Sequence, residues 1–155
     1  MVMINGFAKS GSLFLKNGRV KTLTLSLLYG FNAPGMVSEN DYYLYLLKEY
    51  IHPDEIEVPD NVEPYLIEFP FSNEDQKALM ISAWKEFNKD YEDLATMIIE
   101  SVFDGDTAPE DLTDEDISLV YQIHGFIGVR MYISDVYPGT KYSDTCISEL
   151  TFSFE

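Results

Sequence analysis

The segment VRMYISDVYPGTKYSDTCISEL, residues 129–150, decides the fold that we expect for this chain. Its first half alternates apolar and polar side chains, and this period of two indicates a half-buried strand. Pro138 and Gly139 then interrupt the alternation, as in a type II turn, and it resumes over residues 146–154. Two strands joined by a loop rich in Tyr, Lys, Asp and Thr predict the edge of an all-β structure that displays its loop.

Two stretches of the chain resemble one known family. The run VYPGTKYSDTCISEL is similar to the closing strands of the bacterial glycan-binding domain found beside NADase-type modules, a relative of the discoidin or galactose-binding-like β-sandwich. The run INGFAKSGSLFLKNGRVKTLTL, residues 4–25, resembles that family's middle strands, with an Asn-Gly-aromatic segment followed by N-x-R-V-K. The resemblance leaves out the middle of the chain, and it leaves out the family's first strands with their Asp-Gly…Trp segment.

The resemblance implies a galactose-binding-like (jelly-roll) β-sandwich that is N-terminally truncated and carries an acidic helical insertion. Residues 1–35 and 117–155 are expected to form the sandwich strands, with both ends of the chain side by side in one sheet-on-sheet core. Residues 38–116 are expected to form the insertion.

Length and composition place the chain among single globular domains. It has 155 residues, of which 46% are hydrophobic and 14% aromatic, which argues against disorder. No apolar run is long enough for a membrane span, and the N-terminus lacks a signal-peptide pattern. We therefore expect a cytoplasmic protein if the chain is complete, and an extracytoplasmic one if it is a fragment of an exported parent.

The negative charge is concentrated in the middle of the chain. The formal net charge is −17, and residues 39–116 hold 23 of the 27 acidic residues but only four lysines. Nucleic acid is excluded as a partner because binding phosphates requires a basic face. The acidic charge indicates solubility or, alternatively, the steering of a basic partner.

The clearest helix is expected over residues 73–102, with Ser72 as its N-cap. An apolar stripe runs along it, at Met80, Trp84, Phe87, Tyr91, Leu94, Ile98 and Val102. A stripe at helical spacing predicts a covered face, either against the core or against a partner. Residues 42–51 suit a helix or a buried strand, and the alternation over residues 117–125 indicates a strand.

No catalytic set is evident, and we predict that the protein is not an enzyme. The available bases are His52 and His124, and Cys146 suits a small buried thiol. The acidic loop Asp104–Asp116 has oxygen ligands of the kind that calcium prefers, but its spacing does not follow the known calcium loop. We predict a solvated loop there, without a metal or other cofactor.

The ligand candidates lie in the two family-like segments, where aromatic faces and polar side chains match what sugars require. These candidates are Tyr137, Lys141, Tyr142, Asp144, Asn17 and Arg19. We also expect Glu149 to form an internal ion pair with Arg19 or Arg130. The resulting hypothesis is a non-catalytic module that binds a glycan, a cell-surface polysaccharide or another surface. The alternative is a protein-interaction or scaffold module that uses the Met80–Val102 helix stripe to bind a partner or a second copy.

Overall fold

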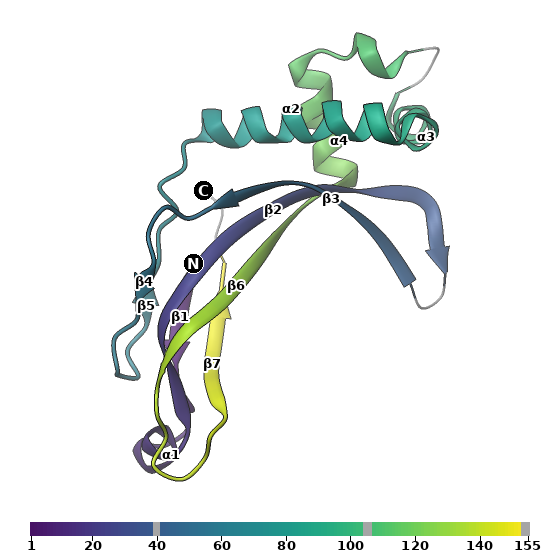
Figure 1. Cartoon of the computed structure of the whole chain (residues 1–155). Helices are drawn as coiled ribbons and strands as arrows, with labels where there is room; N and C mark the ends of the chain where they lie inside the picture. Colours follow the sequence, from purple (N-terminus) through teal and green to yellow (C-terminus); the bar gives the residue numbers. More distant parts are fainter. Residues whose placement is uncertain (39–40, 104–106, 153–155) are drawn as a thin grey trace. The chain divides into compact units, whose positions relative to one another are not determined.

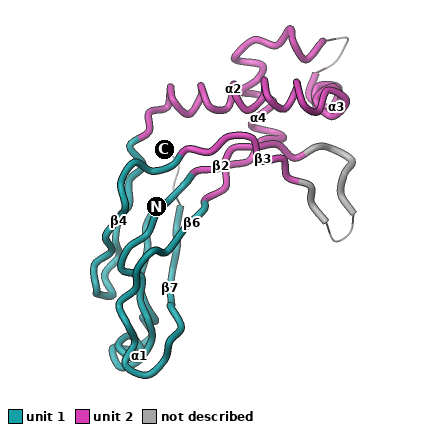
Figure 2. The backbone as a smooth tube through the Cα atoms, viewed as in Figure 1, with its two compact units in different colours: residues 1–26, 51–70, 130–155 teal, residues 27–50, 71–129 magenta. Residues whose placement is uncertain are grey.

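The computed structural model describes residues 1–38, 41–103 and 107–152, and only the backbone for residues 33–38 and 41–43. Within these residues the fold is mixed α/β, with one mixed sheet and four α-helices (Figure 1). The chain divides into two compact units (Figure 2). Unit 1 comprises residues 1–26, 51–70 and 130–155, and unit 2 comprises residues 27–50 and 71–129.

The sheet is built on one long strand. Its members are β1 (Val2–Asn5), β2 (Gly18–Ser38), β3 (Asp41–Ile51), β4 (Ile56–Glu57), β5 (Tyr65–Leu66), β6 (Gly125–Tyr137) and β7 (Thr145–Thr151). The main strand order is β3-β2-β7-β1-β5, and β4 and β6 also pair with β2. The expected galactose-binding-like β-sandwich is therefore wrong, because the described strands form a single sheet. The expected separate insertion is wrong for the same reason, since residues 38–116 supply β3, β4 and β5.

The two ends of the chain do lie side by side, as the sequence indicated. β1 pairs antiparallel with β7, with Val2 opposite Thr151 and Met3 opposite Leu150. β2 pairs parallel with β7 at Gly18 and Thr145. The strand character of the first and last segments was thus predicted correctly, although these strands share a sheet instead of forming two facing sheets.

Asn5 fastens β1 to β2 in unit 1. It is 1% exposed, and its Nδ2 donates to the Val20 carbonyl (2.7 Å) and to the Pro59 carbonyl (3.3 Å). Its Oδ1 accepts from the backbone N–H groups of Val20 (2.9 Å) and Gly6 (3.0 Å). One side chain therefore satisfies both polar groups of the buried Val20 backbone, which would otherwise lose water without replacement.

The segment after β1 requires a glycine and then forms a short helix. Gly6 has φ +67°, and a Cβ there would lie 2.6 Å from the ring of Phe14, so a side chain is excluded. The residues that follow form a short helix, α1 (Gly11–Lys16). Ser10 begins this helix by accepting a hydrogen bond from the Leu13 N–H, and Phe14 is buried.

Unit 2 has an aromatic core where its helices meet β2 and β3. The rings of Trp84, Phe87 and Tyr121 lie 5.1 to 5.4 Å from the ring of Phe31, measured between centroids. Phe31 and Phe87 are 0% exposed and Trp84 is 1% exposed. The helix stripe that we considered as a partner surface is thus largely covered inside unit 2.

The helix expected over residues 73–102 is two helices, α2 (Asn73–Asp90) and α3 (Glu92–Val102). They are separated by Tyr91, whose φ −141° and ψ 52° are not helical. The predicted N-cap at Ser72 is confirmed, and it forms a capping box with Asp75.

The strand expected over residues 117–125 is also wrong, because residues Asp114–His124 form α4. Thr113 and Asp116 form a capping box at its start. A 3-10 turn at Pro109–Asp111 precedes it. Residues 42–51, for which helix and strand were both open, lie in β3.

Candidate functional site

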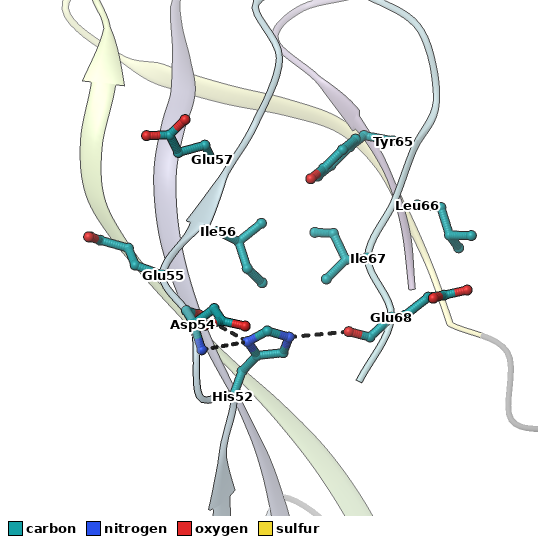
Figure 3. A pocket seen from close by; sticks show the side chains of 9 residues that line it. All are labelled: His52, Asp54, Glu55, Ile56, Glu57, Tyr65, Leu66, Ile67 and Glu68. Carbon is teal, nitrogen blue, oxygen red and sulfur yellow. Dashed lines mark hydrogen bonds between the residues drawn. The ribbon is translucent and has the colours of Figure 1, made fainter. Parts of the chain in front are cut away.

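A depression in unit 1 lies between β4 and β5, and we call it the β4–β5 slot (Figure 3). It has a volume of about 340 Å³ and is lined by residues from two neighbouring stretches of the chain: His52, Asp54, Glu55, Ile56, Glu57, Tyr65, Leu66, Ile67 and Glu68. β4 is held on its far side by β2, and β5 by β1. The slot is therefore bordered by two strands that each pair on the side away from it.

The floor of the slot is apolar. Ile56 and Ile67 point toward one another between the two strands (Figure 3), and they are 8% and 4% exposed. Tyr65 is half-buried beside them. These positions alternate with exposed ones along each strand, as the period of two requires.

The rim of the slot is acidic. Residues 51–70 contain six acidic residues and neither lysine nor arginine. Glu55, Glu57 and Glu68 line the slot and are exposed. Among the described residues, Asp60 is the member of this stretch that forms a salt bridge, with Arg19. The rim thus presents several carboxylates that no cation within the described part of the chain neutralises by direct contact.

His52 closes one end of the slot. It is 8% exposed, its Nδ1 accepts from the Asp54 N–H (3.1 Å), and its Nε2 lies 3.2 Å from the Glu68 carbonyl oxygen. The tautomer with the proton on Nε2 satisfies both contacts at once. Figure 3 shows the ring bridging the two sides. His52 is consequently a structural connection between the two sides of the slot.

Two of the six predicted ligand residues are internal. Asn17 is 7% exposed and its Nδ2 donates to the Leu13 carbonyl at 2.7 Å. Arg19 is 5% exposed and binds both carboxylate oxygens of Asp60, at 2.6 and 3.0 Å. The hydrogen bond with Asp60 raises the pKa of Arg19 above its ordinary value, although burial opposes this shift. These donors hold unit 1 together and do not reach solvent.

Arg19 also anchors the loop that carries the other candidates. Its guanidinium donates to the Pro138 carbonyl at 3.3 Å and lies 5.8 Å from the centroid of the Tyr137 ring. The Tyr137 hydroxyl donates to the Val58 carbonyl at 3.2 Å. Arg19 and Tyr137 are therefore brought together, but their contacts are with the protein itself.

The remaining three candidates lie in the loop between β6 and β7. Lys141 and Asp144 are exposed, and the Lys141 ammonium lies 5.1 Å from the centroid of the Tyr142 ring. Tyr142 is 43% exposed. The backbone of this loop is fixed by hydrogen bonds, from the Tyr142 N–H to the Lys16 carbonyl (2.9 Å) and from the Gly18 N–H to the Asp144 carbonyl (2.7 Å).

The turn at the start of this loop differs from the prediction. Gly139 has no positive φ, since Gly6 is the residue with a positive φ among those described. A type II turn is therefore wrong. The glycine is required for another reason, because a Cβ at Gly139 would lie 2.4 Å from the Lys16 carbonyl oxygen.

The internal ion pair expected for Glu149 is also wrong with respect to Arg19, which binds Asp60. Glu149 is exposed and accepts a hydrogen bond from the Thr151 hydroxyl at 3.1 Å. Cys146, expected to be buried, is half-buried. Burial and the neighbouring Asp144 raise the pKa of its thiol.

The nearest approach to a nucleophile and base is in unit 2. The Ser101 hydroxyl lies 2.8 Å from His124 Nε2, but it also lies 2.6 Å from the Ile98 carbonyl oxygen. A hydroxyl has one hydrogen and donates to only one of these acceptors. Burial lowers the pKa of His124 below its ordinary value, while a hydrogen bond with the Asn32 backbone opposes this shift.

Neither a metal centre nor a membrane-spanning helix is present in the described part of the chain. There, no group of three or more His, Cys, Asp or Glu side chains is placed to hold a metal ion. Residues 104–106 of the loop considered for calcium lie outside the described residues. In the same described part, no helix combines the length and apolarity that crossing a membrane requires.

Comparison with known proteins identifies no relative of this chain. No family model matches the chain, and no curated protein and no solved structure matches it. The glycan-binding resemblance therefore rests on the two quoted motifs alone.

Sequence reasoning missed the slot altogether, since none of the six predicted ligand residues lines it. The sequence nevertheless contains a pattern that indicates the slot. Ile56-Glu57-Val58 and Tyr65-Leu66-Ile67-Glu68 both alternate, in a stretch without lysine or arginine. Pro59 favours a connector over residues 56–61, and the prolines at positions 64 and 70 favour an edge strand over residues 62–71, so neither run by itself indicates a binding site.

Proposed function

We propose that the protein is a non-catalytic binding module whose β4–β5 slot binds a positively charged segment of another protein. The observation that carries this proposal is the combination of an apolar floor with an acidic rim. Ile56 and Ile67 form the floor, and the surrounding stretch of residues 51–70 has no lysine or arginine. Such a site favours a ligand with both alkyl and cationic parts, as the side chains of lysine and arginine have.

Charge supplies the selectivity in this proposal. Rim carboxylates attract a basic partner and repel an acidic one, and they act mainly on association rate and specificity. The same repulsion argues against nucleic acid. The binding should therefore weaken strongly as salt is raised, because exposed charges are screened.

The glycan hypothesis retains less support than the protein-partner hypothesis. Asn17 and Arg19 are committed to internal hydrogen bonds, which leaves Lys141, Tyr142 and Asp144 as exposed candidates. We keep saccharide binding as the competing outcome of the test.

The test uses the full chain and a fluorescein-labelled octalysine peptide, with fluorescence anisotropy at about 50 and about 300 mM NaCl. The slot variant is Glu57→Gln with Glu68→Gln. The control variant, Glu100→Gln with Glu110→Gln, removes the same charge from exposed sites in unit 2. At roughly 0.2 to 1 kcal/mol per exposed charge, the slot variant should bind about twofold to thirtyfold more weakly.

The control should bind the peptide as the wild type does. An equal loss in both double variants would mean non-specific attraction to an acidic protein and would reject the slot. Binding of simple saccharides that is lost in Tyr142→Ala, without octalysine binding, would replace this proposal by the glycan hypothesis.

A further inference from the structure

The strand edges that border the slot have main-chain groups directed into it. The Val58 N–H donates to the Lys21 carbonyl at 2.8 Å, so the main-chain groups of Val58 face β2. Because these groups alternate in direction along a strand, those of the preceding residue, Glu57, face the opposite way. In β4, Glu57 therefore directs its N–H and carbonyl toward the slot.

β5 has the same arrangement. The Ile67 N–H donates to the Met1 carbonyl at 2.8 Å, and the Met1 ammonium donates to the Ile67 carbonyl at 2.8 Å. Ile67 thus faces β1, and its neighbours Leu66 and Glu68 face the slot. In the tautomer with the proton on Nε2, His52 already donates a hydrogen bond to the Glu68 carbonyl there. This contact shows that a donor inside the slot reaches the β5 edge.

The two faces of these strands differ in character. Ile56 and Ile67 lie on the buried face, whereas Glu55, Glu57 and Glu68 are exposed. A strand placed beside β5 would also alternate, with one set of side chains toward the floor and the other toward the rim. The floor favours apolar side chains and the rim favours basic ones.

We propose that the slot binds its basic partner by strand addition, with an extended segment of alternating basic and apolar residues pairing antiparallel to the free edge of β5. This inference rests on the proposed function and specifies its partner. Main-chain hydrogen bonds to Leu66 supply part of the affinity, and the alternation supplies the specificity. A residue directly opposite Leu66 shares its exposed face, so that residue is a basic one whose N–H points to β5.

The test compares the binding of three labelled peptides, of equal length, equal charge and the same numbers of lysine and valine residues, to the full chain. The first peptide alternates lysine and valine, and the second has all its lysines before its valines. The third is the alternating peptide with a methyl group on the backbone nitrogen of each lysine. We expect the first to bind at least about tenfold more tightly than either of the others. The tighter binding should be lost in the Glu57→Gln, Glu68→Gln variant and kept in the Glu100→Gln, Glu110→Gln control.

A second readout reports the backbone directly. In the free protein the Leu66 N–H faces the open slot, so its amide hydrogen should exchange rapidly. Saturation with the alternating peptide should slow this exchange by at least about tenfold, since a bonded amide is protected, whereas the block peptide should leave it unchanged.

The outcomes separate the two proposals. If all three peptides bind equally, if their binding depends on Glu57 and Glu68, and if Leu66 stays unprotected, strand addition is overturned and the acidic slot remains as a site for basic segments. If no peptide binds in a manner that depends on Glu57 and Glu68, the slot itself is rejected.

Discussion

Asn5 provides the most informative test of how unit 1 is held together. Its side chain is the hydrogen-bond partner of both the N–H and the carbonyl of Val20, and Val20 is 0% exposed. Asn5→Leu keeps nearly the same shape but removes every one of these bonds. The substitution therefore separates packing from hydrogen bonding.

The expected magnitude follows from counting the groups left without a partner. The Gly6 N–H also donates to the Cys146 carbonyl at 3.0 Å, and the Pro59 contact is long, so these two groups lose little. The two Val20 groups lose the partner that the Asn5 side chain provides. At roughly 1 to 3 kcal/mol for each buried group, Asn5→Leu should lower the free energy of unfolding by about 2 to 6 kcal/mol.

Asn5→Asp adds a pH dependence to the same test. One oxygen of the new carboxylate can still accept from the Val20 and Gly6 N–H groups. The other oxygen replaces the amide donor and faces the Val20 and Pro59 carbonyls. Burial and this repulsion should raise the pKa of the carboxyl group in the folded state. The unfolded state then binds fewer protons than the folded state between the two pKa values. Stability is therefore highest below the unfolded pKa of about 4 and is lost as pH rises above it.

Urea unfolding followed by circular dichroism, at about pH 4 and about pH 7, measures both effects. The control is Asn61→Leu, because Asn61 is exposed and its side chain accepts a local hydrogen bond from the Glu63 N–H. An Asn5→Leu protein within about 1 kcal/mol of the wild type would refute the reasoning, since packing alone would then account for the site.

Five further substitutions, at four positions, test other parts of the structure. Trp84→Ala should lower the free energy of unfolding, measured in urea, by about 3 to 5 kcal/mol because of the cavity that it leaves. Trp84→Asp should unfold unit 2 instead of dissociating a dimer, and size-exclusion chromatography with circular dichroism would show which of the two occurs. Ser72→Ala should lower the unfolding free energy by about 1 kcal/mol through loss of the cap of α2, without a change in m-value. Arg19→Met should lower the free energy of unfolding, measured by thermal melts, by about 2 kcal/mol. The two backbone carbonyls that Arg19 binds lose a charged donor, whereas the partly exposed Asp60 carboxylate becomes hydrated again. Burial lowers the pKa of His124 in the folded state, so the free energy of unfolding should fall as the pH drops below about 6.5. His124→Gln should remove that part of the dependence of stability on pH. An unchanged dependence in this variant would contradict the lowered pKa.

The sequence was informative where a strong local pattern coincides with one environment. In β2, the period of two at Leu23, Leu25, Leu27 and Tyr29 indicates a strand from the sequence alone, and all four residues are buried. The cap at Ser72 was predicted from its position before an apolar stripe. Both features depend on residues that are neighbours in the chain.

The errors arose where patterns were short or where distant segments decide the outcome. Residues 117–125 satisfy a period of two and a helical period equally, and the capping box from Thr113 to Asp116 settles the choice. A sandwich requires two sheets, but nothing local to β2 reveals that it is long enough to receive β3, β4, β6 and β7 along its length. The number of sheets is a property of pairing between segments and not of any one segment.

The candidate site was missed for a similar reason. Its floor and rim come from Ile56-Glu57 and Leu66-Ile67-Glu68, which are ordinary surface sequences when read singly. They become a site because β2 holds one stretch and β1 holds the other. The predicted ligand residues Asn17 and Arg19, by contrast, are polar because they satisfy an interior, which residue type alone does not distinguish from binding.

The pairing of β1 with β7 has a consequence for how the protein is made. The Ser148 hydroxyl donates to the Gly6 carbonyl across a separation of 142 residues, and contacts of such separation slow folding. On the ribosome, unit 2 has its whole sequence once residue 129 has been synthesised, whereas the first strand must wait for the last. β1 is thus without its β7 partner until residues 145–151 have been synthesised, and this is the interval in which a chaperone would have most to protect.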